Sequence, residues 1–248
     1  ARCLGWCLRA WLWSLPAGIG FATLRAIVKL WLGFPPQYSG VYSAGNGPAM
    51  RVAVIGAFFA HDPQRRSAYV AVSTRITHTD PKALTGAAAI AELAAWIVRD
   101  ALTERPPLAP FLALLRASGP DDRDWQALVD AIAQAAQDDA PVGELAERLG
   151  LAKGVTGYIY HTVPIAAYAW FRHNSDYQHA LTAVLDCGGD TDTVGAITGA
   201  LAGATVGEAG IPQEWQSGIV DWPRSPPLLR TLADRLATVQ TTRQPAAP

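Results

Sequence analysis

The feature that most constrains the fold is an uncharged stretch, residues 194–207, that follows two aspartates. Small residues recur in it at helical spacing, with Gly199, Gly203 and Gly207 on one line and Ala196, Ala200 and Ala204 on the next. A helix that is apolar all round is expected inside a domain. Glycine costs about 1 kcal/mol relative to alanine in a helix, so we expect these glycines to admit closely packed backbones. The stretch therefore predicts a buried central helix with two acids at its start.

The two acids, Asp190 and Asp192, alternate with Thr191 and Thr193. Acids at a helix start often act only as caps, because their oxygens accept hydrogen bonds from free backbone N–H groups. One cap needs one oxygen, however, and this turn has four oxygen-bearing side chains and no neighbouring Lys or Arg. Buried carboxylates must be paired, protonated or metal-bound. A hard cation such as Mg²⁺ or Mn²⁺ suits an all-oxygen cluster, so capping and metal binding both stay open.

Two other acid-rich motifs fit these residues less well. The calcium loop of an EF-hand places oxygen ligands where this chain has Val194 and Leu201. The D-x-D-x-[TV] pattern of haloacid dehalogenase-type phosphotransferases matches residues 190–194, but there the first Asp ends a hydrophobic strand. Here Gly188 and Gly189 precede it, and the flanking segments have helical patterns.

A second candidate site is the glycine-rich loop that ends at Pro48. Gly45 and Gly47 flank Asn46, so the backbone can turn sharply, while Ser43 and Asn46 offer polar groups beside a helix N-terminus. Free N–H groups and the positive end of a helix dipole suit a phosphate or a ribose. By itself, this pattern is more often a plain loop with an Asn turn.

Together these motifs resemble the ADP-ribosylglycohydrolase family, which includes the dinitrogenase reductase-activating glycohydrolases. The similar segments are G-G-D-T-D-T, A-I-x-G-A-x-A-G-A and G-x-x-x-I-P-x-x-W after residue 187, and S-x-G-N-G-x-A-M-R at residues 43–51. The resemblance implies a site for two Mg²⁺ or Mn²⁺ ions, with these ligands: Asp190, Asp192 and Thr193. It also implies contacts to ADP-ribose from five residues: Ser43, Gly45, Asn46, Gly47 and His78.

Two parts of the family pattern do not occur in this sequence: a G-D-x-x-G segment and a T-D-D triplet that complete the metal site. Asp121 and Asp122 follow Pro120 instead of Thr, and we expect them on a solvated surface. Either these residues are the C-terminal portion of a longer protein, or the chain is a degenerate member. The first case predicts a hydrolase that removes ADP-ribose from modified proteins or related conjugates. The second predicts an inactive ADP-ribose-binding module, or a structural protein like the family's lens crystallins.

Every element with a clear pattern is helical, so we expect an all-α fold, a compact orthogonal arrangement of many helices. No repeat or linker divides the chain, and residues 1–248 are expected to form one domain, with an N-terminal segment of the family pattern missing. Tyr158 and Tyr160 fit core packing better than a pocket lining. The main expected helices cover residues 48–59, 64–76, 81–99, 157–173 with a kink or restart at Pro164, 174–185, and 228–239 before a frayed tail at 241–248.

The net charge and the composition of the chain indicate which kinds of partner and which cellular compartment to expect. A formal net charge of −1 argues against a nucleic-acid partner held by phosphate electrostatics. Three cysteines without a zinc pattern favour a reducing, cytoplasmic setting. Charged residues make up only 17% of the chain, which indicates a large buried fraction or a covered face.

The N-terminal segment is rich in tryptophan and is expected to form two helices separated at Pro16. Its longest uncharged run, residues 10–24, is shorter than the roughly 20 residues that a membrane span requires. Core or interdomain packing is a commoner explanation for such tryptophans than a membrane-surface helix. The tryptophans of this segment are Trp6, Trp11, Trp13 and Trp31. The oligomeric state stays open.

Overall fold

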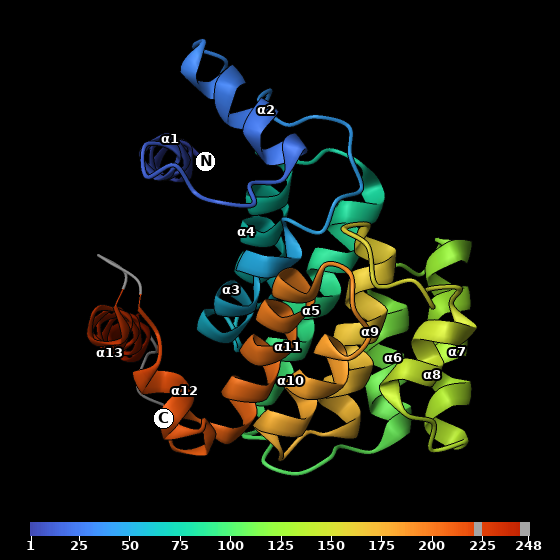
Figure 1. Ribbon diagram of the computed structural model, residues 1–248. Coiled ribbons are helices and arrows are strands. Elements are labelled where there is room, and N and C mark those ends of the chain that lie inside the picture. The colour runs from blue at the N-terminus through green and yellow to red at the C-terminus, as the bar shows by residue number, and fades with distance from the viewer. Residues whose placement is uncertain (221–224, 244–248) are drawn as a thin grey trace.

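The protein is described here by a computed structural model that covers residues 1–220 and 225–243. In these ranges the regular elements are all helical, which confirms the all-α expectation (Figure 1). The α-helices are α1 (Arg2–Leu12), α2 (Phe21–Trp31), α3 (Ala53–Phe58), α4 (Pro63–Arg75), α5 (Pro81–Arg99), α6 (Leu108–Ala117), α7 (Arg123–Gln137), α8 (Val142–Arg148), α9 (Ile159–Arg172), α10 (Tyr177–Leu185), α11 (Thr191–Val206), α12 (Gln213–Ser217) and α13 (Pro226–Arg243). Two 3₁₀ helices, η1 (Ala49–Arg51) and η2 (Glu208–Gly210), complete the set.

Helix α5 is the centre of the fold and packs against α3, α4, α9 and α11. Its start agrees with the sequence prediction, because Asp80 accepts a hydrogen bond from the backbone N of Lys82 and Pro81 occupies the first turn. Backbones do approach closely here, since a Cβ on Gly56 of α3 would lie 2.1 Å from the carbonyl oxygen of Ala91. Helix α5 is also long and apolar enough to cross a membrane, but 61% of that window is buried within the fold.

Helix α11 is only partly the buried helix that the sequence predicts. One side is buried, but Ala196 and Ala204 are exposed. The glycine line packs against side chains instead of backbones, because Gly199 faces the ring hydroxyl of Tyr177 on α10. Gly207 ends the helix with a φ of 66°, a conformation that favours glycine. The glycines of α11 therefore make room for the ring of Tyr177 and allow the turn that ends the helix. The prediction of close backbone packing was wrong.

Three other helix predictions need correction. The segment after Pro48 divides into η1 and α3, since Val52 leaves regular α-helical geometry between them. Helix α9 continues through Pro164 without a restart, and almost every residue from Ile159 to Phe171 is buried, so packing offsets the lost hydrogen bond. The expected frayed tail is helical as far as Arg243, and residues 244–248 lie outside the described ranges.

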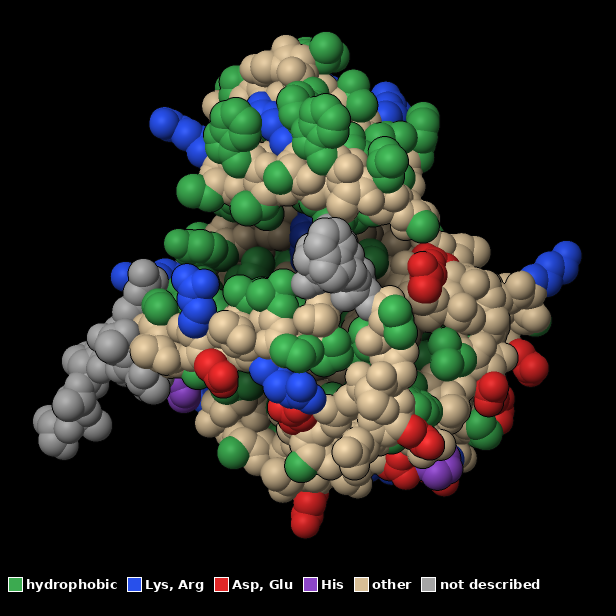
Figure 2. Space-filling view, turned by 60° about the vertical axis from the view of Figure 1, so that its left-hand side comes forward, with side chains coloured by type: hydrophobic (Ala, Val, Ile, Leu, Met, Phe, Trp, Pro, Cys, Tyr) green, Lys and Arg blue, Asp and Glu red, His purple; other side chains and the backbone are tan. Residues whose placement is uncertain are grey.

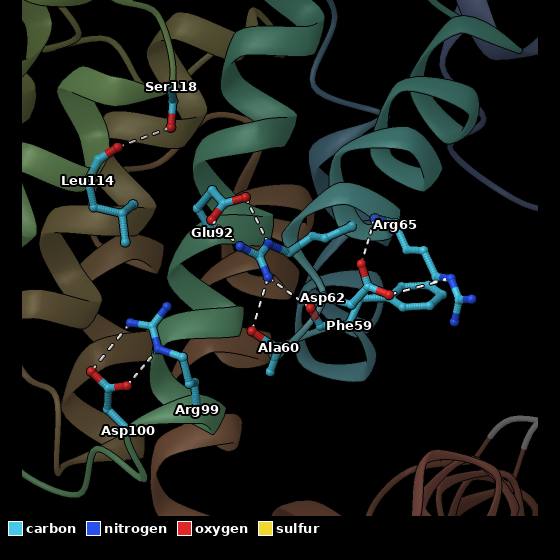
Figure 3. A network of polar contacts seen from close by, with 10 residues as sticks. Phe59, Ala60, Asp62, Arg65, Glu92, Arg99, Asp100, Leu114 and Ser118 are labelled. Carbon is cyan, nitrogen blue, oxygen red and sulfur yellow. Dashed lines mark hydrogen bonds and ion pairs between the residues drawn. The ribbon is translucent and has the colours of Figure 1, made fainter. Parts of the chain in front are cut away.

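A buried arginine that no sequence motif marks links α3, α4 and α5, and Figure 3 labels its partners Phe59, Ala60 and Glu92. Arg66 is 4% exposed and donates two hydrogen bonds to the Glu92 carboxylate, at 2.8 and 2.7 Å. It also donates to the carbonyl oxygens of Phe59 and Ala60. Because a buried charge is costly without partners, this network fixes how the end of α3 meets α4 and α5.

The acid at the start of α7 is more than a solvated residue. Asp122 accepts from the backbone N of Trp125 as the helix cap, and its other oxygen accepts a 2.7 Å hydrogen bond from the buried Tyr160 hydroxyl. Burial, which tends to raise the pKa of Asp122, is outweighed by these bonds, and the pKa is lowered. The expectation of a simple solvated surface was wrong for Asp122, whereas core packing of Tyr160 is confirmed.

Helices α1 and α2 form an N-terminal lobe, residues 1–34, in which they pack mainly against each other (Figure 1). The connection between them contains Pro16, as expected. Most of the lobe's tryptophans are not core residues: Trp6, Trp13 and Trp31 are exposed, and only Trp11 is partly buried. The core-packing alternative was wrong for those three residues, and packing against another domain remains a prediction.

Candidate functional site

A cavity of about 660 Å³ lies between the N-terminal lobe and the helical core. Its volume is in the range of about 300–1,000 Å³ that is typical of small-molecule sites. All of the residues predicted from the sequence as ligand or metal contacts line it: Ser43, Gly45, Asn46, Gly47, His78, Asp190, Asp192 and Thr193. Segments separated by more than a hundred residues therefore meet at one cavity.

Backbone hydrogen bonds join the loops that carry these residues. The segment 154–158 is the central one, because it pairs on one side with the glycine-rich loop and on the other with the Asp190 loop. Asn46 N donates to Gly157 O at 2.9 Å, and Asp190 N donates to Val155 O at 2.7 Å. Gly189 is needed here, since its φ is 81° and a Cβ would lie 2.1 Å from Val155 O. The site thus has a rigid floor made of irregular backbone.

The side chain of Asn46 bridges the two predicted motifs. Its amide nitrogen donates to Asp190 Oδ2 at 2.7 Å and to Thr162 Oγ1 at 2.9 Å, and Asn46 is 8% exposed. The Asn46 bond to Asp190 is charge-assisted, the stronger kind of hydrogen bond. Asn46 therefore holds the carboxylate of Asp190 in one orientation at the edge of the cavity.

Asp190 occupies the N-cap position of α11, but its carboxylate makes no capping hydrogen bond there. Partial burial tends to raise the pKa of Asp190, yet hydrogen bonds from Asn46 and, secondarily, Thr193 outweigh this, so the pKa is lowered. The carboxylate is therefore ionised at neutral pH. The main partner of the Asp190 carboxylate is therefore Asn46, and Thr193 in the first turn of α11 is a secondary one.

The imidazole of His78 lies under the glycine-rich loop and is 3% exposed. Its Nδ1 lies 2.8 Å from Thr77 Oγ1, and Nε2 has no hydrogen-bond partner among the described residues. Burial, with a contribution from the nearby Arg51 charge, lowers the pKa of His78 to about 4, so the ring is neutral at pH 7. A Cβ on Gly45 would lie 3.0 Å from Nε2, and one on Gly47 would lie 3.1 Å from Cε1. Both glycines thus let the loop lie close against this ring, since a Cβ at either position would make a tighter contact than usual.

Arg51 was missed by the sequence reasoning, although it lies in the matched segment of the glycine-rich loop. It lines the cavity and donates to Gly47 O at 3.0 Å and to Ser73 O at 2.6 Å, so its guanidinium is fixed behind the loop. Burial lowers the pKa of Arg51 to about 10, which leaves it charged at neutral pH. The first turn of α2, which no side chain caps, lines the same cavity. These features give the loop side of the cavity a positive character.

The oxygen-bearing side chains at the start of α11 are of the kind that binds a divalent cation. Asp190, Asp192 and Thr193 offer hard oxygen atoms, and Asp192 is exposed to the cavity's solvent. Mg²⁺ is commonly held by one or two carboxylates with several waters. In residues 1–220 and 225–243, however, no group of three or more His, Cys, Asp or Glu side chains gathers at one point. The residues fit one hydrated ion, and the two-ion site remains a prediction.

Comparison with known proteins agrees with this arrangement. The sequence model of the ADP-ribosylglycohydrolase family matches residues 1–246. The chain belongs to the ADP-ribosylglycohydrolase family. A protein of Archaeoglobus fulgidus, itself uncharacterised, is 32% identical over 204 residues, which cover 82% of this chain and 62% of that protein. Human ADP-ribosylhydrolase ARH3 is 28% identical over 226 residues, covering 79% of this chain and 59% of ARH3.

The fold comparison supports the same family. A solved structure of an ADP-ribosylglycohydrolase-related protein complex superposes with a TM-score of 0.67 at 26% identity, covering 94% of this chain and 70% of that one. This chain spans about three fifths of the length of the curated relatives that it matches.

The sequence motifs located the two ends of the site but not the segment between them. Residues 154–157 and Thr162, which connect the motifs, carry no chemistry that would single them out. The feature of this segment that could have marked it in the sequence is its two glycines, Gly154 and Gly157. Gly154 has a φ of 113°, a conformation that favours glycine, and a Cβ on Gly157 would lie 3.3 Å from Asp190 Oδ2.

Proposed function

We propose that the cavity binds the ADP-ribose unit of ADP-ribosylated proteins or related conjugates, as part of an activity that hydrolyses the ADP-ribosyl bond. The observation that carries the proposal is the Asn46–Asp190 hydrogen bond, which joins the two motifs, so that an ionised carboxylate and the Arg51 guanidinium line one small-molecule cavity. A ligand with a diphosphate and polar sugar hydroxyls matches both groups. Membership of the ADP-ribosylglycohydrolase family supports the same ligand.

The chain's own residues have separate tasks in this proposal. Arg51 and the backbone N–H groups around Gly45 and Gly47 stabilise the diphosphate charge. Neutral His78 offers Nε2 to a ligand oxygen, as either donor or acceptor. Asp190, oriented by Asn46, accepts a hydrogen bond from a ribose hydroxyl. Together these contacts would hold the ligand in one orientation in the cavity.

Mg²⁺ or Mn²⁺ is part of the proposal as a cofactor. Asp190, Asp192 and Thr193 would hold it, and it would supply Lewis-acid stabilisation of charge while the bond at the anomeric carbon breaks. Asp190 suits this task because its carboxylate is already ionised at neutral pH. A cytoplasmic location and the absence of a nucleic-acid partner remain predictions of the sequence.

A second candidate function is ADP-ribose binding without turnover. The observation in its favour is that Asp190 and Asp192 are the acids among the described residues that line the cavity. Two carboxylates are few for holding metal ions and activating a water. In this case ligand affinity is retained and hydrolysis is negligible.

Calorimetric titration of ADP-ribose into the chain, with and without Mg²⁺ or Mn²⁺, tests the proposal. We expect binding that the metal strengthens and that the Asp190→Ala/Asp192→Ala variant loses. Asp186→Ala is the matched control, because Asp186 is exposed on the same loop and does not line the cavity. Folded protein that binds no ADP-ribose under either condition contradicts the proposal. Release of ADP-ribose from modified peptides, measured alongside, distinguishes hydrolysis from binding alone.

A further inference from the structure

A buried threonine that has no part in the proposed ligand contacts lies between two side chains that do. Thr77 is fully buried, and its Oγ1 accepts a 2.5 Å hydrogen bond from Nη2 of Arg51 and lies 2.8 Å from Nδ1 of His78. Arg51 and His78 both line the cavity, whereas Thr77 does not. Figure 2 shows a hollow between the N-terminal lobe, at the top of the view, and the rest of the molecule, with basic side-chain atoms inside it. The Thr77 hydroxyl therefore links the arginine and the histidine behind the cavity wall.

The Thr77 hydroxyl has one proton to donate, and two acceptors lie near it. One is the carbonyl oxygen of Thr74, at 3.4 Å, which is long for a hydroxyl hydrogen bond. That oxygen already accepts from the backbone N of His78 at 2.9 Å and of Thr77 at 3.1 Å, so both of its lone pairs are used. The other acceptor is Nδ1 of His78, at the ordinary distance of 2.8 Å. The geometry therefore favours donation of the Thr77 proton to Nδ1.

The charge of Arg51 sets the same direction. A guanidinium only donates, so Thr77 Oγ1 must accept from it, and a hydroxyl that accepts from a cation donates more strongly to its next partner. With the opposite tautomer, the N–H groups of Arg51 and of Nδ1 would both point at one oxygen, and their positive ends would repel. Burial and the Arg51 charge lower the pKa of His78 to about 4, so at neutral pH the ring carries one N–H only.

We propose that Thr77 is a positioning residue that holds His78 in the tautomer with its proton on Nε2, so that the ring donates a hydrogen bond into the cavity. Nε2 has no partner among the described residues. Gly45 and Gly47, which have no Cβ to cover the ring, lie beside it. This position therefore takes an acceptor oxygen of the ligand, and an anionic oxygen best, because the charge of Arg51 acts on the same ring. The ligand in this inference rests on the proposed function, whereas the tautomer is a property of the free protein.

Nuclear magnetic resonance of the full chain, without ligand and at pH 7, tests the tautomer. In protein labelled with ¹⁵N-histidine, long-range ¹H–¹⁵N correlations distinguish a ring nitrogen that bears a proton from one that does not. The variant His78→Gln identifies the His78 signals among the five histidines. We expect a proton on Nε2 and none on Nδ1.

A second signal assigns the effect to Thr77. An unconstrained imidazole mildly favours the same tautomer, so the tautomer by itself does not show what holds it. Because Thr77 is fully buried, its hydroxyl proton should exchange slowly with water and be visible as a separate resonance. We expect this resonance to be coupled to Nδ1 of His78 across the hydrogen bond.

Three variants separate this role from packing. Thr77→Val keeps the shape but removes the hydroxyl, so the hydroxyl signal should vanish, the Nδ1 resonance should shift, and ADP-ribose should bind about tenfold more weakly. Thr77→Ser keeps a hydroxyl and should restore the Nδ1 resonance and the affinity. Ser73→Ala is the matched control, because it removes a different partner of Arg51, the 3.1 Å bond from Nε to Ser73 Oγ, and should leave the His78 signals unchanged. Circular dichroism establishes that each variant is folded.

Several results would overturn the inference. A proton on Nδ1 in the wild type would make His78 an acceptor toward the ligand, and an unchanged His78 spectrum in folded Thr77→Val would remove the role of Thr77. If Thr77→Val does not fold, the hydroxyl resonance of the wild type and of Thr77→Ser decides instead. ADP-ribose that binds without moving the Nε2–H signal would refute the donor role. Failure of the proposed function looks different: the free protein has the expected tautomer, but calorimetry detects no ADP-ribose binding.

Discussion

The buried, neutral His78 makes the stability of the protein depend on pH in a way that can be measured. In an unfolded chain its pKa is 6.5, whereas in the folded protein burial and the charge of Arg51 lower it to about 4. Below pH 6.5 the unfolded chain gains a proton that the folded protein does not bind. The His78 contribution is therefore fully present above pH 6.5 and is lost as the pH falls toward 4. Between about pH 7 and pH 4.5, linkage gives a loss of roughly 2.5 kcal/mol.

The assay is urea unfolding followed by far-ultraviolet circular dichroism at both pH values, for the wild type and His78→Gln. Carboxylates with lowered pKa, including Asp190, also lose stability in acid, but they do so in both proteins. The wild type should therefore lose roughly 2.5 kcal/mol more than the variant on acidification. His61→Gln, which replaces an exposed histidine, is the control and should behave as the wild type. Equal pH dependence of the wild type and His78→Gln would refute the reasoning, because it would mean that His78 is protonated as readily folded as unfolded.

Three further substitutions test the site and its supports. Asn46→Ala removes the donor that orients Asp190 and should cost about 2 kcal/mol in urea unfolding, together with a clear loss of ADP-ribose affinity by calorimetry. Gly189→Ala places a Cβ against backbone at a positive φ and should lower the free energy of unfolding by roughly 2–4 kcal/mol. Gly143→Ala is the control and should change it by less than about 1 kcal/mol, because open space surrounds Gly143. Similar melting temperatures for the two variants would contradict the packing argument. Tyr160→Phe loses a hydrogen bond to the α7 cap and should lower stability by about 1–2 kcal/mol without changing ADP-ribose affinity, since Tyr160 lies outside the cavity.

Much of the site could be predicted from the sequence because its residues lie in compact local motifs. The glycine-rich loop and the Asp190 turn each carry several functional residues within a few positions, so each motif is recognisable by itself. Thr162 could not be predicted in this way. Its role depends on a contact with a residue far along the chain, the 2.9 Å bond to Asn46. Long-range pairing leaves no periodic pattern in the sequence.

The sequence by itself determined the helical class and many helix starts, because caps and apolar periodicity act within a few residues. Asp80 and Pro81 begin α5 as predicted for this reason. Only the tertiary structure decided which way the Asp190 carboxylate points, since the competing partner, Asn46, is 144 residues away. It also decided that Trp13 is exposed while Trp125 is buried, although both tryptophans lie at the end of an α-helix. Burial depends on which surfaces meet in three dimensions, and local sequence does not specify that.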